Sequence, residues 1–235
     1  RLKISRLPYY QQFLELVKEH PDAIYLDIGC CFGNDVRKAA ADGYPLGNII
    51  ASDLRGDFWQ LGHRLFNTTQ DTFPVPFVEG DVFQDSHISS LLTLPAEHQS
   101  IDADTLSKLN SLTPLKGAIS AIHASALFHL FDESHQKILA RKLACLLSPR
   151  PGSMIFGVHV GRPVKGFRVE GAGLGGLGAS MFCHSAESWK TLWEEKIFPP
   201  GTIHVEAEVT EMSRDDLNAP PSIKFYQLTW CIRRL

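Results

Sequence analysis

Several features that would point to a membrane, a secretory route or nucleic acid are missing from these 235 residues. No apolar run is long enough to span a bilayer, and no charged segment followed by an apolar one opens the chain. The formal net charge is only −3 and no block of like charges occurs, which argues against a nucleic-acid-binding face. We therefore expect a cytoplasmic protein that acts on a small molecule, without nucleic acid or membrane, and leave a homodimer open.

Cysteine is scarce, and its pattern excludes a disulfide framework. The five cysteines are an odd number, have no C-x-x-C spacing and fall mostly in apolar stretches: Cys30, Cys31, Cys145, Cys183 and Cys231. This pattern is typical of reduced thiols, so we expect neither disulfides nor a metal site. The adjacent pair, Cys30 and Cys31, is predicted to consist of small buried side chains, since a redox role would require a lowered thiolate pKa.

Two common nucleotide-binding fingerprints are also absent. In YLDIGCCFGNDVRKAA, residues 25–40, a G-x-G-x-x-G motif would need glycines at positions 29, 31 and 34, which hold Gly29, Cys31 and Asn34. No G-x-x-x-x-G-K-[ST] string occurs anywhere, so a phosphate-binding P-loop is excluded. A ligand without a pyrophosphate therefore fits this turn better than NAD.

What the sequence does contain is an alternation of short apolar runs and helical segments. The runs predicted as strands are residues 23–29, 48–54, 76–82, 117–124, 153–160, 202–210 and 224–232. The helical segments between the first five are residues 35–41, 58–66, a region from Ser86 with more helix at 102–112, and 133–147. This order predicts an α/β fold with a Rossmann-like seven-stranded sheet and helices on both faces. The last two runs are too close for a crossover helix and are predicted to form a C-terminal antiparallel hairpin.

The length fits a single domain spanning residues 1–235. Within residues 1–20, apolar residues at helical spacing predict an N-terminal helical cover. Residues 95–114 interrupt the alternation and are predicted to be a helical insertion. Residues 161–184 are predicted to be a glycine-rich substrate loop, because α/β proteins usually build their ligand cover after the carboxyl end of a strand.

Acidic residues stand at or near the ends of the first three predicted strands: Asp27, Asp53 and Asp81. Each alone could cap a turn or a helix, but together with the glycine turn they favour a nucleoside site. Asp27 suits an ammonium group, Asp53 suits ribose hydroxyls, and Asp81 suits an adenine amino group. S-adenosyl-L-methionine, which becomes S-adenosyl-L-homocysteine, carries these groups. The predicted cofactor-binding residues are Asp27, Gly29, Cys30, Cys31, Gly33, Asp53, Leu54, Asp81, Val82 and His123.

Four strings carry a family resemblance: LDIGCCFGNDVRKAA, SDLRGDFWQLGHRLF, IHASALFHLF and HSAESWKTLW. They resemble class I S-adenosylmethionine-dependent methyltransferases over about Leu7 to Arg233. More narrowly, they are similar to fungal secondary-metabolite methyltransferases of meroterpenoid pathways, including carboxyl methyltransferases of the austinol and andrastin type. The resemblance implies the strand order 3-2-1-4-5-7-6 and O-methylation of a carboxylate on a polyketide-terpenoid intermediate. Cys31 stands where the broad class more often has glycine, in keeping with the narrower group.

Two histidines are candidates for catalysis. His123 ends the fourth predicted strand and would orient a carboxylate or act as a base, and His129 follows in the same string. A structural role is the alternative for both. A carboxylic acid is already ionised at neutral pH, so only an acceptor such as a phenol requires a base. The candidate substrate-binding residues beside the glycine-rich loop are Phe182, His184 and Trp189, the last of which has helical spacing that also allows a core position.

Two other functions remain open at this point. A methyltransferase fold can bind the cofactor and catalyse isomerisation or cyclisation without methyl transfer, or it can serve as a non-catalytic regulator. The intact acids at Asp27, Asp53 and Asp81 argue against the regulator, which has no chemical need of them.

Overall fold

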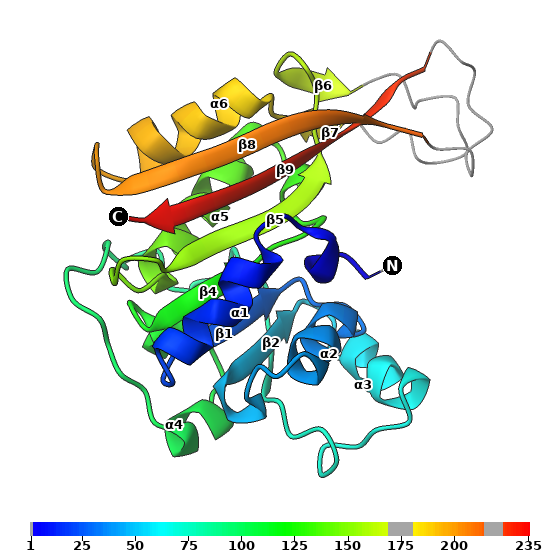
Figure 1. Cartoon of the computed structure of the whole chain (residues 1–235), viewed down its shortest axis with the longest axis vertical. Coiled ribbons are helices and arrows are strands. Elements are labelled where there is room, and N and C mark those ends of the chain that lie inside the picture. Colours follow the sequence, from blue (N-terminus) through cyan, green and yellow to red (C-terminus); the bar gives the residue numbers. More distant parts are fainter. Residues whose placement is uncertain (1, 169–180, 214–222) are drawn as a thin grey trace.

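A seven-stranded sheet forms the centre of the protein (Figure 1). The computed structural model describes residues 2–168, 181–213 and 223–235. The strands run in the order β3-β2-β1-β4-β5-β9-β8. Their bounds are β1 Ile24–Ile28, β2 Ile49–Asp53, β3 Phe77–Glu79, β4 Ile119–His123, β5 Met154–Val160, β8 Ile203–Met212 and β9 Phe225–Arg234. The first five are parallel, and β9 pairs antiparallel with both β5 and β8, which confirms the predicted Rossmann-like sheet and hairpin.

Helices cover both faces of this sheet, as predicted. The helices are α1 Tyr10–Glu19, α2 Asn34–Ala41, α3 Gly56–Leu65, α4 Ala103–Ser107, α5 Glu133–Leu146 and α6 Ala186–Thr191, the last continuing into a π-helical turn at Leu192–Ile197. Buried side chains of α1 to α3 share one apolar core, and those of α4 to α6 share the other. Adjacent strand residues alternate between the two cores because side chains of a strand point to opposite faces, as Tyr25 and Leu26 do.

The chain between β3 and β4 differs from the prediction. Residues 81–100 form turns and coil instead of the helix predicted from Ser86. Of the helices predicted between β3 and β4, only α4 is present. In this segment, hydrogen bonds from side chains to backbone carbonyls take the place of the backbone hydrogen bonds of a helix. The buried Lys142 of α5 donates from Nζ to the carbonyl oxygens of Ile88, at 2.6 Å, and Phe83, at 3.3 Å. Prolines at 95 and 114 further restrict helix growth.

Two short strands are present that the sequence did not predict. β6 Gly166–Arg168 and β7 Met181–Cys183 pair antiparallel as a separate two-stranded sheet, at the two ends of the segment predicted as a glycine-rich loop. Three-residue strands are too short to show a clear alternation of apolar and polar residues. The glycine-rich part, residues 169–180, lies outside the described residues. Among the described helices, none has the length and apolarity needed to cross a membrane.

Candidate cofactor site and active site

The turn that joins β1 to α2 has an unusual backbone. Gly29, Cys31 and Gly33 have φ angles of 73°, 51° and 70°, in the left-handed region that favours glycine. A Cβ at Gly33 would also lie 2.5 Å from a ring carbon of Trp59, so this position has no room for a side chain. Cys31 adopts the same kind of conformation with a side chain present. The class preference for glycine at this position therefore has a backbone explanation.

Hydrogen bonds connect this turn to the end of β2. The Cys31 N–H donates to Asp53 Oδ2 at 2.8 Å, and the Arg55 N–H donates to Asp53 Oδ1 at 3.0 Å. Asp53 thus stabilises the turn at Cys31 and the turn at Arg55. This is the capping role predicted from the sequence as the alternative to ligand binding. A carboxylate can accept about four hydrogen bonds, so Asp53 keeps acceptor capacity for a ligand.

Asp81 lies beside Asp53 along the same edge of the sheet. The Gly80 N–H donates to the Asp53 carbonyl oxygen at 3.0 Å, and Asp81 Oδ1 accepts from the Phe83 N–H at 2.9 Å. Asp81 and Val82 are partly buried, whereas Leu54 is 61% exposed. The structure therefore brings Asp53 and Asp81 together, and it places the predicted Leu54 at the surface of this edge.

A buried chain of hydrogen bonds crosses from β1 to β4. Asp27 and His123 are register neighbours, 3% and 1% exposed, and Asp27 Oδ1 lies 2.8 Å from His123 Nδ1. His123 Nε2 lies 2.7 Å from Ser125 Oγ, which also accepts from the Val158 N–H at 3.2 Å. Burial raises the pKa of Asp27, and the adjacent His123 opposes this rise. Both ring nitrogens of His123 are therefore hydrogen-bonded within the protein.

Several of these groups line one cavity of about 210 Å³. Its lining residues are Lys3, Asp27, Gly29, Cys30, Cys31, Phe32, Asn34, Asp35, His123 and Ser125. The cavity lies at the carboxyl ends of β1 and β4, where open α/β sheets bind ligands. We call it the cofactor cavity.

Four polar residues of the cofactor cavity were not predicted from the sequence: Lys3, Asn34, Asp35 and Ser125. Asn34 opens α2, and its Oδ1 is buried without a hydrogen-bond partner among the described residues. Asp35 Oδ1 accepts from the backbone N–H groups of Lys3 and Ile4, at 2.8 and 2.9 Å. The signal that could have found Asn34 and Asp35 is their position in the first turn of the helix after the glycine turn. Lys3 had no local signal, because only tertiary structure brings it to this cavity.

The paired thiols show no sign of activation. Cys30 and Cys31 are both free, and burial raises the pKa of each thiol, most strongly for Cys30. Within the described residues, no group of histidine, cysteine and acidic side chains is arranged to hold a metal ion.

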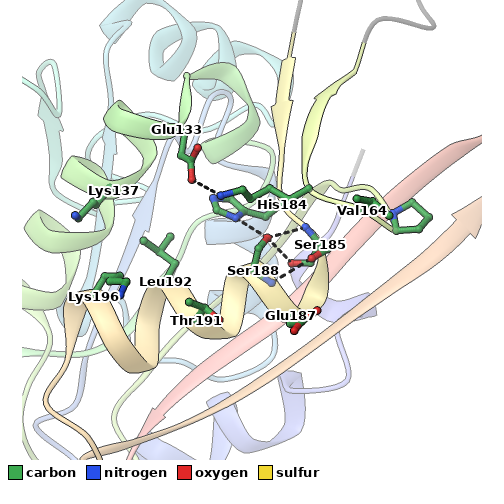
Figure 2. Close-up of a pocket in the computed structure, with 12 residues that line it drawn as sticks. Glu133, Lys137, Val164, His184, Ser185, Glu187, Ser188, Thr191, Leu192 and Lys196 are labelled. Carbon is green, nitrogen blue, oxygen red and sulfur yellow. Dashed lines mark hydrogen bonds and ion pairs between the residues drawn. The ribbon is translucent and has the colours of Figure 1, made fainter.

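The predicted substrate-binding residues lie in a different place. Phe182 and Trp189 are buried, and Trp189 packs in the core against Phe128 and Trp230, the alternative that its spacing allowed. His184 lines a second cavity, of about 550 Å³, between α5, α6 and the segment before β6 (Figure 2). This His184 cavity shares no lining residue with the cofactor cavity.

The second catalytic candidate, His129, does not line the cofactor cavity, although the charge of Lys3, which does, acts on it. It lies in the 3₁₀ turn Phe128–Leu130, and its ring stacks on that of His159 with centroids 6.2 Å apart. Burial lowers the pKa of His129 to about 4, and burial lowers the pKa of His184 to about 4 as well. Both imidazoles are therefore neutral at physiological pH.

The comparison with known proteins assigns the family. No protein-family model matches the chain. "Methyltransferase ausD" of Aspergillus calidoustus is 30% identical over 234 residues, which cover 99% of this chain and 73% of the relative. The chain belongs to this family of fungal secondary-metabolite methyltransferases. The predicted resemblance is thereby confirmed.

Two further relatives show how much of a longer protein this chain represents. "O-methyltransferase phiE" of Fungal sp. is 31% identical over 178 residues, covering 76% of this chain and 50% of that protein. "Asnovolin E/Chermesin D methyltransferase nvfJ" of Aspergillus novofumigatus is 29% identical over 234 residues, covering 99% and 73%. The methyltransferase chain thus spans between half and three-quarters of the length of these relatives.

Solved structures confirm the fold. The Burkholderia thailandensis 1,6-didemethyltoxoflavin-N1-methyltransferase matches with a TM-score of 0.54 and 11% identity, over 95% of this chain and 76% of that one. The plantazolicin methyltransferase BpumL matches with a TM-score of 0.53 and 15% identity, over 96% and 81%. Both of those proteins were solved with S-adenosylhomocysteine. At such low identity the likeness carries the fold alone.

Proposed function

We propose that this chain is an S-adenosylmethionine-dependent O-methyltransferase that acts on a carboxylate of a small molecule, a polyketide-terpenoid intermediate. The observation that carries the proposal is the cofactor cavity. It combines a left-handed glycine turn, a buried Asp27 and an Asn34 oxygen that has no partner in the described part of the chain, at the carboxyl ends of β1 and β4. Family membership and the fold support the same activity.

The residues of the cavity fit the proposed cofactor. Its ammonium group needs hydrogen-bond acceptors, and Asn34 Oδ1 is a buried acceptor without a partner among the described residues. Asp53 and Asp81 lie outside this lining, at the adjacent ends of β2 and β3, and in this proposal Asp53 accepts from the ribose hydroxyls and Asp81 from the adenine amino group. When bound, the cofactor supplies an activated methyl group, whose bond to sulfur breaks as the acceptor oxygen binds the carbon.

The acceptor is argued from the state of the two candidate histidines. A general base must have a free nitrogen and a pKa close to the working pH. His123 has both nitrogens engaged and is 1% exposed, while the pKa of His129 is about 4. Neither residue is suited to deprotonate a phenol. A carboxylate requires no deprotonation at pH 7, and no proton changes place during its methylation.

The relatives support a small natural product as acceptor. One of them is named for methylating asnovolin E or chermesin D. From that name we take only the class of acceptor, a small metabolite, for this chain.

The proposal is tested by calorimetric titration of the chain with S-adenosylhomocysteine. We expect micromolar binding in the intact chain and a loss of at least about tenfold in Asp53→Ala, because hydrogen bonds to a charged acceptor contribute about 1.5 to 3 kcal/mol. Asp57→Ala, an exposed acid in the first turn of α3, is the matched control. Absence of binding by the intact chain would overturn the cofactor assignment.

A second measurement separates transfer from the other functions. With deuterated-methyl cofactor and an acid acceptor, methyl transfer yields one S-adenosylhomocysteine per product, and the product is an ester that alkali hydrolyses. An isomerase or a regulator would consume no cofactor.

A further inference from the structure

A third cavity, of about 800 Å³, adjoins the cofactor cavity. It is formed by the N-terminal segment, by β5 and by the two strands of the hairpin, which lie close together in Figure 1. Its lining residues are Leu2, Lys3, Arg6, Leu7, Pro8, Val158, Glu208, Thr210, Met212, Gln227 and Thr229. We call it the hairpin cavity.

The strand register explains why these side chains converge. Val158 of β5 is paired with Thr229 of β9, which is paired with Glu208 of β8. Gln227 and Thr210 form the next pair, two residues further along each strand. Residues two apart in a strand point to the same face, so all five side chains lie on one face of the sheet.

Two contacts join the hairpin cavity to the cofactor cavity. Lys3 lines both, and the N–H of Val158, which lines the hairpin cavity, donates to Ser125 Oγ in the cofactor cavity. The His184 cavity has no residue in common with either. An acceptor must come within reach of the transferred methyl group, so the hairpin cavity is the better placed of the two.

Lys3 is held where the two cavities meet. Its N–H and that of Ile4 donate to the same oxygen of Asp35, and the Ile4 side chain is fully buried in the core. The Lys3 side chain is itself partly buried, and its ammonium makes no ion pair or hydrogen bond with any residue that the structure describes. The charges of Asp35 and Asp27 act on this ammonium from beyond ion-pair distance. A partly desolvated cation that makes no direct contact with a described acceptor can still bind an anion.

We propose that the hairpin cavity is the acceptor site and that the Lys3 ammonium binds the carboxylate of the acceptor. This inference rests on the proposed methyltransferase function and names the acceptor class from the chain's own residues. Leu2, Leu7 and Met212 offer apolar surface to a hydrocarbon skeleton. Among the lining residues of the hairpin cavity, Lys3 and the exposed Arg6 are cations and the exposed Glu208 is the one acid, which favours an anionic ligand. Asp27 and Asp35, which also act on Lys3, line the cofactor cavity instead.

The test compares Lys3→Met, which removes the charge, with Lys3→Arg, which keeps it. The probes are terpenoid monocarboxylic acids, among them farnesoic acid, each assayed beside its primary alcohol with deuterated-methyl cofactor. We expect esters from the acids only. We expect Lys3→Met to lower kcat/KM by about 10- to 100-fold, mainly through KM, as for a lost charge-assisted hydrogen bond. Lys3→Arg should retain most of the activity.

Two controls make the outcome specific. Lys18→Met makes the same charge change at an exposed position of α1 and should leave kcat/KM unchanged. The affinity of each variant for S-adenosylhomocysteine is measured separately, because Lys3 also lines the cofactor cavity. If that affinity falls by the same factor as kcat/KM, Lys3 serves the cofactor and the inference is wrong.

The remaining outcomes are equally decisive. Equal loss in Lys3→Arg and Lys3→Met would identify Lys3 as a base rather than an anchor, because a guanidinium is not deprotonated in proteins. Full activity of Lys3→Met would exclude both roles. Bound S-adenosylhomocysteine without transfer to any acid would overturn the acceptor class, whereas failure to bind S-adenosylhomocysteine would overturn the proposed function itself.

Discussion

The left-handed backbone of Cys31 predicts that glycine at this position stabilises the protein. At φ 51° a residue with a Cβ carries a steric cost of about 1 to 2 kcal/mol, which glycine does not. Glycine also gives the unfolded chain more freedom, which costs about 0.4 to 1 kcal/mol of stability. The balance favours glycine over alanine by about 1 kcal/mol, between zero and roughly 1.6.

The measurement is urea unfolding of Cys31→Gly against Cys31→Ala. The two variants both lack the thiol, and they differ only in the Cβ, so their difference isolates the backbone term. Thermal unfolding provides a second measurement. In a chain of this size, a stability difference of about 1 kcal/mol corresponds to about 2 to 4 °C in the melting temperature, which scanning calorimetry resolves. We also expect both variants to bind S-adenosylhomocysteine as the original chain does, since burial raises the pKa of the Cys31 thiol and leaves it protonated at neutral pH.

Two results would refute this reasoning. If Cys31→Ala is at least as stable as Cys31→Gly, then the left-handed conformation does not carry the steric cost assigned to it. If both variants fold but no longer bind S-adenosylhomocysteine, then the thiol itself contacts the cofactor.

Three further predictions concern stability. Because the pKa values of His129 and His184 are lowered to about 4, the unfolded chain takes up protons that the folded chain does not, so stability is complete above pH 6.5 and falls toward pH 4. Each of the two histidines should contribute about 1.3 kcal/mol less to the free energy of unfolding at pH 5.5 than at pH 7.5. Urea unfolding at a series of pH values measures this dependence, and asparagine at either position should make it weaker. Lys142→Met should cost about 2 to 4 kcal/mol, because a buried carbonyl, that of Ile88, and a partly buried one, that of Phe83, lose a charged donor. The exposed Lys137→Met on the same helix should cost little. Gly33→Ala should lower the melting temperature and cofactor affinity together, by its clash with a tryptophan ring; unchanged values of both would contradict the described turn.

The sheet could be predicted from the sequence because its signals are local. Buried strands such as 24–28 and 119–123 appear as short apolar runs, and the brief gap before the last run excludes a crossover helix. The segment 81–100 could not be predicted, because its backbone is held by Lys142, which lies more than 50 residues away in the sequence. Its apolar residues gave a helical pattern that tertiary contacts override.

The strand-end residues of the candidate site could be predicted from the sequence, but the residues brought there by other parts of the chain could not. Asp27, Asp53 and Asp81 stand at strand ends, and parallel strands bring their carboxyl ends to one edge, so topology alone places them together. Lys3 reaches the cofactor cavity through tertiary contacts that no spacing reveals, whereas Ser125 stands two residues after the end of β4 and could have been found from that position. His184 was assigned to the substrate because it follows the glycine-rich segment, but proximity in sequence does not place it beside the cofactor cavity.

This asymmetry follows from how the two cavities are built. The cofactor cavity is formed mainly by the ends of β1 and β4 and by one tight turn, whose backbone φ angles leave few alternatives. The hairpin cavity is formed by side chains from the N-terminal segment and from β8 and β9, at the edge of the sheet. Side chains there can change without disturbing the turn, because the two cavities share only Lys3. If the hairpin cavity binds the acceptor as proposed, the acceptor can change while the residues of the cofactor cavity stay the same.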